Sequence, residues 1–129
     1  MGNLVVDSSA WIEYFMGTDR GRKVRKHLAH QDIRVFTTGP IVTEVISKFL
    51  REGQPIGEVV EALHTLAVVI HFDLDLAKST AEIYVRQRRI KSKFGLIDAH
   101  IVAAARLVQG KVLTCDQDFV EFKEALVLK

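Results

Sequence analysis

Short apolar runs alternate along the chain with stretches in which apolar residues recur every three or four positions. A short continuous apolar run is typical of a buried strand, and the wider spacing is typical of one face of a helix. Four runs predict strands at residues 4–6, 33–37, 67–70 and 112–114. A further run at residues 126–128 is the candidate for a fifth strand.

The segments between these runs predict helices, several with recognisable ends. They cover residues 10–16, 19–28, 40–52, 55–66, 74–90, 96–109 and 117–122. Ser8 or Ser9 is the expected N-cap of the first helix, and Pro40 fits the first turn of the third. In the helix that begins at Pro55, four apolar residues are expected to face inward: Val59, Val60, Leu63 and Leu66.

Strands that alternate with helices indicate a parallel sheet whose two faces are covered by helices. The expected fold class is therefore α/β, with four to five parallel strands and right-handed crossovers. The chain has 129 residues, which corresponds to one domain spanning residues 1–129. No internal repeat or linker interrupts this pattern.

The composition is that of a folded domain, and it restricts the cellular compartments in which we expect the protein. Hydrophobic residues make up 48% and charged residues 26%, which excludes a disordered chain. Cys115 is the single cysteine, so an internal disulfide is excluded and a reducing compartment is indicated. The apolar runs are too short for a membrane span, and the first residues lack the basic start of a secretory signal. We therefore expect a cytoplasmic protein with no membrane association.

Positive charge is concentrated in two windows, at residues 20–26 and 86–93, which together hold ten bases and no acid. The rest of the chain keeps eight Lys and Arg against sixteen Asp and Glu. We interpret the ten bases as RNA-binding: Arg20, Arg22, Lys23, Arg25, Lys26, Arg86, Arg88, Arg89, Lys91 and Lys93. The alternative is that they are two ordinary solvated helix faces.

Two acids directly follow predicted strands, Asp7 after the first and Asp116 after the fourth. In an open parallel sheet the carboxyl ends of the strands share one rim, where ligands bind. We therefore expect these carboxylates to lie close together. Because both also precede helices, the alternative for each is N-capping.

Three further acids are candidates for the same cluster. At 100° per residue, Asp98 falls within the apolar stripe of its helix, where a carboxylate has to be paired, hydrogen-bonded or bound to a cation. The alternative is an acid that caps its own helix. Glu44 lies at the flank of an apolar face and could equally be a surface residue, and Asp118 could join the cluster or only favour a helix end.

Oxygen ligands without a His or Cys pattern favour a hard cation, Mg²⁺ or Mn²⁺. A zinc site is not expected, because the five histidines are scattered and offer no third ligand. Such a cation polarises a phosphoryl oxygen and lowers the pKa of a bound water. Carboxylates around a metal, with basic helices nearby, point to phosphodiester hydrolysis.

Four segments in this order resemble the PIN-domain ribonucleases, and specifically the VapC-type toxins of prokaryotic toxin–antitoxin pairs. They read VVDSSAWIEYF, TEV, LIDAHIVAAA and LTCDQDF. The resemblance covers nearly the whole chain. It implies that Asp7, Glu44, Asp98 and Asp116 form the catalytic metal site, with Asp118 less uniformly included. It also implies that Thr114 supports these acids, and that Ser8 acts in the same way.

The resemblance further implies a three-layer α/β/α sandwich, a homodimer, and an Mg²⁺- or Mn²⁺-dependent endoribonuclease. The expected role is the toxin of a type II toxin–antitoxin pair, whose VapB-type antitoxin occludes the site. The alternative is a catalytically inactive PIN scaffold that binds RNA or a protein partner. A phospho-receiver domain is disfavoured because residues 50–57 contain no Asp, the strand near 67–72 leads only into Asp73, and Cys115 and Asp116 stand where a receiver needs a Lys. A haloacid-type phosphatase is disfavoured because Ser9 replaces its second acid.

Overall fold

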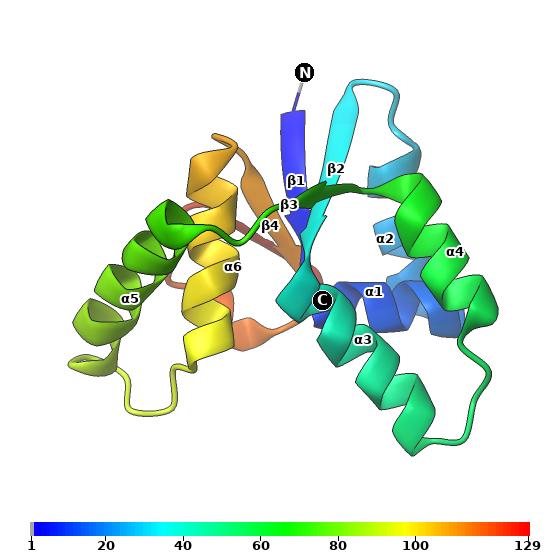
Figure 1. The fold of residues 1–129 in the computed structure, drawn as a ribbon. Helices are drawn as coiled ribbons and strands as arrows, with labels where there is room; N and C mark the ends of the chain where they lie inside the picture. The colour runs from blue at the N-terminus through cyan, green and yellow to red at the C-terminus, as the bar shows by residue number, and fades with distance from the viewer. Residues whose placement is uncertain (1) are drawn as a thin grey trace.

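The strands form one parallel sheet with β1 near its centre (Figure 1). The computed structural model describes residues 2–129. In this part of the chain the strand order is β3-β2-β1-β4-β5. The strands are β1 (Gly2–Val6), β2 (Ile33–Thr38), β3 (Val68–Ile70), β4 (Lys111–Thr114) and β5 (Ala125–Val127). All four pairings are parallel, which confirms the expected sheet and its fifth strand.

The helices lie in two layers, one on each side of the sheet. They are α1 (Ser8–Met16), α2 (Asp19–Ala29), α3 (Gly39–Arg51), α4 (Gly57–Leu66), α5 (Leu74–Arg88) and α6 (Leu96–Leu107), followed by the short 3₁₀ helix η1 (Gln117–Phe119). Figure 1 shows α5 and α6 on one side and α1 to α4 on the other. This arrangement confirms the three-layer α/β/α sandwich.

The core lies between these layers and contains the residues that the apolar pattern selects. Val5, Val6 and Leu113 from the two central strands are completely buried, as is Trp11 on α1. Trp11 stacks on Phe15 with ring centroids 5.9 Å apart. On α6 four alanines are buried and let the helix lie close to the sheet: Ala99, Ala103, Ala104 and Ala105.

The first helix is capped by a different residue from the one expected. Asp7, not Ser8 or Ser9, is the N-cap of α1, because the helix begins immediately after the strand. Gly17 ends this helix in the left-handed conformation, with φ of 68°. Four residues later, a Cβ on Gly21 would lie 2.0 Å from the Glu13 carbonyl oxygen, so glycine permits the close approach of α2 to α1.

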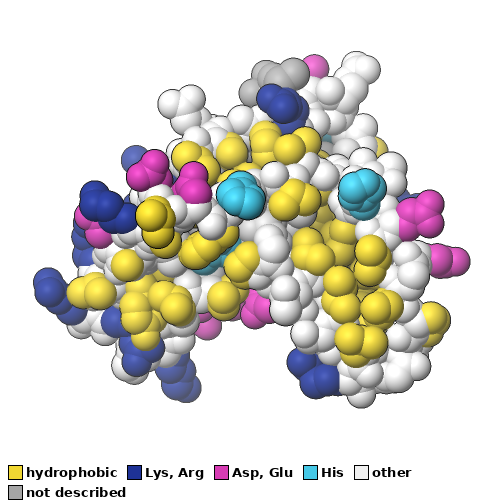
Figure 2. Space-filling model, in the orientation of Figure 1, with side chains coloured by type: hydrophobic (Ala, Val, Ile, Leu, Met, Phe, Trp, Pro, Cys, Tyr) yellow, Lys and Arg dark blue, Asp and Glu magenta, His cyan; other side chains and the backbone are white. Residues whose placement is uncertain are grey.

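Other departures concern α4 and β3. The helix expected from Pro55 begins at Gly57 without a side-chain cap, and its Val60 and Leu66 are 43% and 38% exposed. β3 is an edge strand, and its Val68 and Val69 are more than half exposed. α4 and β3 lie at the same edge of the sheet. No further strand of residues 2–129 pairs with β3 on that side. Figure 2 shows apolar side chains gathered on this face of the molecule.

Element ends shift by a few residues elsewhere. α5 ends at Arg88 and α6 at Leu107, each two residues before the expected end, and η1 replaces the longer helix expected at 117–122. None of the helices found in residues 2–129 is both long and apolar enough to cross a membrane.

Candidate active site

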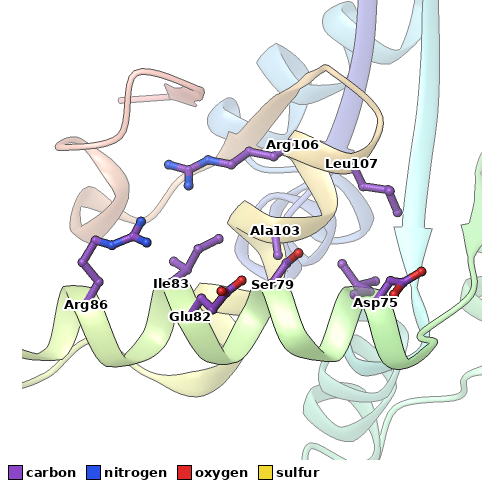
Figure 3. A pocket seen from close by; sticks show the side chains of 9 residues that line it. Asp75, Ser79, Glu82, Ile83, Arg86, Ala103, Arg106 and Leu107 are labelled. Atoms are coloured by element: carbon purple, nitrogen blue, oxygen red, sulfur yellow. The ribbon is translucent and has the colours of Figure 1, made fainter.

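One groove between two helices lies away from the candidate carboxylates. It runs between α5 and the C-terminal half of α6, with a volume of about 360 Å³. Figure 3 shows Glu82 and Arg86 on α5 facing Arg106 on α6 across it. Asp98 is in the first turn of α6, at the other end of that helix. The candidate site is therefore an open rim rather than an enclosed pocket.

The rim is built around Asp7 at the end of β1. This strand pairs with β4, so residues 7 and 116 follow neighbouring strands at the same end of the sheet. The Asp7 backbone N–H donates to the Leu113 carbonyl at 2.9 Å and extends the pairing by one residue. The negative charge of Asp116 contributes to raising the pKa of Asp7, which reflects their proximity. The expected juxtaposition of the two strand-end acids is present.

Asp7 is 4% exposed, and both of its carboxylate oxygens accept hydrogen bonds. Oδ1 accepts from the Ser8 backbone N–H at 2.7 Å. Oδ2 accepts from the hydroxyls of Ser9 at 2.9 Å and Thr114 at 2.7 Å. Burial raises the pKa of Asp7, and these three hydrogen bonds oppose the increase. The carboxylate is thus held rigidly, at a desolvation cost that a bound cation would offset.

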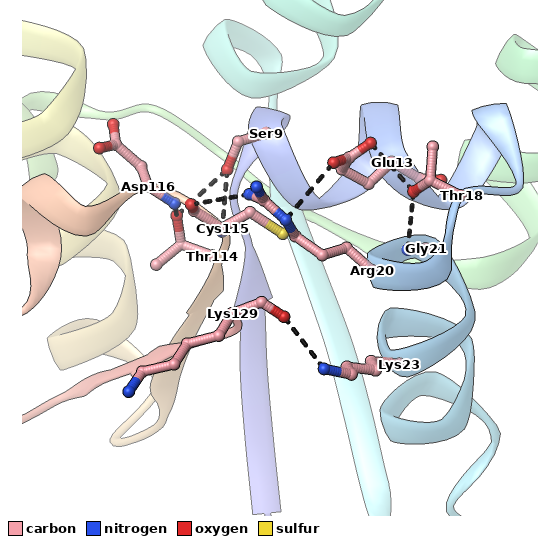
Figure 4. Close-up of polar contacts among 10 residues, drawn as sticks. All are labelled: Ser9, Glu13, Thr18, Arg20, Gly21, Lys23, Thr114, Cys115, Asp116 and Lys129. Atoms are coloured by element: carbon pink, nitrogen blue, oxygen red, sulfur yellow. Dashed lines mark hydrogen bonds and ion pairs between the residues drawn. The ribbon is translucent and has the colours of Figure 1, made fainter.

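Ser9 is the residue of this arrangement that sequence reasoning missed. Its hydroxyl also lies 3.2 Å from that of Thr114 and accepts from the Cys115 backbone N–H at 3.1 Å. Figure 4 shows Ser9 between the start of α1 and the end of β4. Its position two residues after a strand-end acid was the available signal, but its other two partners, Thr114 and Cys115, lie 105 and 106 residues away.

Glu44 and Asp98 approach the rim from opposite layers, on α3 and α6. Burial raises the pKa of Glu44, and the negative charges of Asp7 and Asp98 raise it further, while hydrogen bonding with Ser8 lowers it. Burial also raises the pKa of Asp98, and the charges of Asp116, Asp7 and Asp118 add to the increase. The structure therefore brings all four predicted acids within electrostatic reach of one another.

The capping alternatives are also real, but each uses only one oxygen. Asp98 Oδ2 accepts from the Gly95 backbone N–H at 2.9 Å, and Asp116 Oδ1 accepts from the Asp118 N–H at 2.9 Å. The second oxygen of each carboxylate accepts no hydrogen bond from the residues described here. These caps orient the acids and leave one oxygen of each free to bind a ligand.

The four carboxylates are ligands that suit a hard cation, but their oxygens do not yet converge on one metal position. None of the four acids forms an ion pair with a Lys, Arg or His of residues 2–129. Over the same residues, no three His, Cys, Asp or Glu side chains are clustered tightly enough to hold a metal as they stand. Rotation of exposed Glu44 and of half-buried Asp98 and Asp116 toward the fixed Asp7 carboxylate would complete such a set.

Asp118 lies at the flank of the rim and forms an ion pair with Lys91. Its Oδ1 is 3.4 Å from Lys91 Nζ, which also lies 3.1 Å from Glu121 Oε1. These two acids and its hydrogen bonds to them raise the pKa of Lys91. The contact ties the segment between α5 and α6 to the residues that follow β4. It also draws the Asp118 carboxylate toward Lys91 rather than leaving it free.

On the opposite flank Arg20 reaches from α2 to the end of β4. Its Nη1 donates to the Cys115 carbonyl at 3.5 Å, and its Nε lies 3.8 Å from Glu13 Oε1. Thr18 donates to the other Glu13 oxygen at 3.0 Å and caps α2, so both ends of this network are fixed (Figure 4). Among the ten predicted RNA-binding residues, Arg20 and Lys91 contact residues of the rim itself.

The other predicted bases are spread more widely. On α2, Arg22 pairs with Asp19, Lys23 donates to the Lys129 carbonyl and Arg25 lies over the Tyr14 ring. Lys26 lies beside Gly2 and Ile33 at the opposite end of the sheet. Arg88 donates to the Tyr84 hydroxyl at 3.0 Å, Arg86 lines the groove of Figure 3, and Arg89 and Lys93 are exposed near the end of α5. Figure 2 shows basic side chains gathered at that end.

This chain belongs to the PIN domain family, whose sequence profile matches residues 4–125. The match spans both strand-end acids and the two helices that carry Glu44 and Asp98. It confirms the resemblance seen in the four sequence segments.

Within this family, the chain is similar to ribonuclease VapC11 of Mycobacterium tuberculosis. The two are 28% identical over 121 residues, which cover 90% of this chain and 88% of the relative. The crystal structure of VapC20 from the same organism, described as a sarcin–ricin loop cleaving toxin, superposes with a TM-score of 0.73. It is 22% identical over 94% of this chain and 95% of that chain. VapBC2 of Rickettsia felis gives a TM-score of 0.74 at 13% identity, covering 98% and 97%.

Proposed function

We propose that this protein is a metal-dependent endoribonuclease that hydrolyses phosphodiester bonds in RNA. The observation that carries the proposal is the rim of four acids, with a rigid, buried Asp7, in a chain of the PIN domain family. Its similarity to VapC11, which is named as a ribonuclease, supports RNA as the substrate.

The proposed metal is Mg²⁺ or Mn²⁺, held by Asp7, Glu44, Asp98 and Asp116. The donors are all carboxylate oxygens, which these hard cations prefer. Their mutual repulsion and the lack of a protein cation beside them support the same conclusion. When bound, such a cation polarises the phosphoryl group and lowers the pKa of a water. Asp118 is an additional candidate, after release from Lys91.

The protein's own contribution is to hold these oxygens in place. Thr114 and Ser9 fix Asp7 Oδ2, and the Ser8 N–H fixes Oδ1. The caps at Gly95 and Asp118 restrict the rotation of Asp98 and Asp116. Asp7 is therefore preorganised for a cation, and Glu44, Asp98 and Asp116 turn their side chains toward it on binding. Hydrolysis would form a P–O bond to water, break the ester bond to the leaving ribose oxygen and leave one proton of the water on that oxygen.

Arg20 and Lys91 are proposed to bind RNA phosphates on either side of the rim. Each has a fixed attachment to the protein and N–H donors left over, and they contact residues that precede and follow Asp116 in the chain, Cys115 and Asp118. A guanidinium or ammonium group in this position attracts the phosphate backbone without reading bases. The remaining eight bases would contribute to the long-range attraction of RNA.

The proposed biological role is the toxin of a type II toxin–antitoxin pair in the cytoplasm. A toxin–antitoxin complex from Klebsiella pneumoniae and VapBC2 of Rickettsia felis, bound to a DNA fragment from their promoter, contain chains similar in fold to this one. The exposed apolar side chains on α4 and β3 offer surface for a VapB-type antitoxin or for a second copy in a homodimer. Val68, Val69 and Phe72 are 52%, 58% and 45% exposed.

The decisive test is cleavage of a mixed RNA by purified protein, with the antitoxin absent. We expect internal cuts that require added Mg²⁺ or Mn²⁺ and stop with EDTA. Asp116→Asn should abolish them while RNA binding persists. RNA binding without cleavage by the wild-type protein would favour an inactive scaffold, and cleavage unaffected by EDTA would exclude the metal-dependent mechanism.

A further inference from the structure

A buried hydrogen bond joins the N-cap residue of the helix that carries Glu44 to the helix that carries Asp98. Thr38 Oγ1 lies 2.6 Å from His100 Nε2. Thr38 is completely buried and His100 is 2% exposed, so water does not compete for this bond. Neither residue is among the acids or hydroxyls predicted for the site, and the histidines were set aside when a zinc site was excluded.

Both partners are attached directly to the site elements. Thr38 ends β2, which pairs with the strand that leads to Asp7, and its hydroxyl also caps α3 by accepting from the Ile41 N–H at 3.5 Å. Glu44 lies in the second turn of that helix. His100 is two residues after Asp98 on α6. The bond therefore links the end of β2 and the start of α3 to α6.

The surroundings of His100 show that its ring does more than fill space. Its second nitrogen, Nδ1, is buried and has no hydrogen-bond partner among the described residues. The ring lies 4.8 Å from that of Phe72 and lines a small apolar pocket with Pro40 and Ile97. A phenyl ring would fill the same space without an unpaired buried nitrogen, which is unfavourable. What the imidazole provides, and a phenyl ring would not, is the directional hydrogen bond to Thr38.

We propose that the Thr38–His100 hydrogen bond is a positioning device that fixes the separation of Glu44 and Asp98 so that both carboxylates reach one cation. This inference rests on the proposed function. The negative charges of Glu44 and Asp98 repel each other. A buried hydrogen bond at the N-cap of α3 holds the two helices in place against that repulsion, and it uses no group that would bind the cation. Outer-shell contacts of this kind typically change metal affinity or activity by about 10–100-fold when they are removed.

The test uses His100→Phe, which removes the bond and keeps a ring of similar shape. Thr38→Val removes the hydroxyl, and Thr38→Ser retains it. Thr80→Val is the control, because Thr80 is equally buried but bonds only within α5, to the Leu76 carbonyl. For each folded protein we would measure the Mg²⁺ dissociation constant by calorimetry in the absence of RNA, and kcat and KM for RNA cleavage.

We expect His100→Phe and Thr38→Val each to weaken Mg²⁺ binding by about tenfold or more and to lower kcat with little change in KM. The double variant should be no worse than either single one, since both remove the same bond. Thr38→Ser and Thr80→Val should bind Mg²⁺ like the wild type.

Two results would overturn the proposal in distinguishable ways. A His100→Phe protein that melts at a lower temperature but binds Mg²⁺ with wild-type affinity would reduce the bond to an ordinary structural contact. A wild-type protein that neither binds Mg²⁺ nor cuts RNA would instead overturn the proposed function, and this inference with it.

Discussion

Thr114 Oγ1 donates to Asp7 Oδ2 at 2.7 Å, although 107 residues separate the two in sequence. The bond exists because β1 and β4 are neighbours in the sheet and both end at the rim. The same hydroxyl accepts from the Asp116 backbone N–H at 3.0 Å. One side chain therefore orients the two acids that follow the central strands.

Replacing Thr114 by Val should impair the site more than the fold. Valine has a similar shape and leaves Asp7 Oδ2 with Ser9 alone. A lost hydrogen bond to a buried carboxylate costs about 1.5–3 kcal/mol. We expect a melting temperature lower by several degrees, weaker Mg²⁺ binding and at least tenfold slower cleavage, measured by thermal melting and RNA cleavage. Thr114→Ser keeps the hydroxyl and should retain most activity; equal loss in both variants would contradict this account.

Neutralising Asp7 should change how the stability of the metal-free protein depends on pH. Burial raises the pKa of Asp7 in the folded state above its unfolded value. The folded chain then binds more protons than the unfolded chain between those two values, so its free energy of unfolding falls as pH rises through this interval. Asp7→Asn removes this pH-dependent fall in the free energy of unfolding. In EDTA the melting temperature of the variant, relative to wild type, should therefore be higher at pH 7.5 than at pH 5.

Addition of Mg²⁺ at pH 7.5 should raise the melting temperature of the wild type relative to that of Asp7→Asn. Metal stabilises the wild type by RT ln(1 + [L]/Kd), about 1.4 kcal/mol at tenfold excess over Kd, and should leave Asp7→Asn nearly unchanged. An Asp7→Asn protein that loses stability in EDTA more at pH 7.5 than at pH 5 would show that the carboxylate is stabilising in its ionised form, against this view.

Arg20 and its neighbour Arg22 offer a matched pair for testing the proposed RNA path. Both lie in the first turn of α2, but Arg20 reaches Cys115 at the rim whereas Arg22 pairs with exposed Asp19. Arg20→Gln should raise KM for RNA roughly tenfold, since a charge-assisted contact is worth about 1.5 kcal/mol. It should also reduce the salt dependence of binding by about one slope unit. Arg22→Gln should change KM less than threefold, and equal effects would assign both to general attraction.

Much of this architecture follows from local sequence. The strands were predictable because each is a short apolar run, and Asp7 and Asp116 could be placed at one rim because parallel strands end together. The position of Asp98 was informative because helical periodicity fixes which face of a helix a residue occupies. The exposure of Val68 was not predictable, because the same run of valines suits an edge strand or a central one.

Contacts that depend on tertiary neighbours could not be read from the chain. Ser9 gains its role from the proximity of β4, and His100 from the end of β2, which lies 62 residues away. Lys26 follows Arg20 by six residues, yet α2 carries it to the far end of the sheet. Charge windows in a sequence therefore overestimate how many of their residues reach one surface.

The most direct test of the central claim compares Asp98→Asn with Asp73→Asn. Both acids lie at helix starts and accept one backbone N–H at 2.9 Å, from Gly95 and Leu76 respectively. Asparagine can still accept that bond, so each variant should fold with a melting temperature close to that of the wild type.

The measurement is one Mg²⁺ titration of the wild type and both variants, followed by the rate of internal RNA cleavage and by the melting temperature. If the rim acids form one metal site, Asp73→Asn should cleave like the wild type. Asp98→Asn should lose at least a hundredfold in rate and most of its stabilisation by Mg²⁺. An Asp98→Asn protein that is stabilised normally by Mg²⁺ and cuts RNA at the wild-type rate would contradict the account.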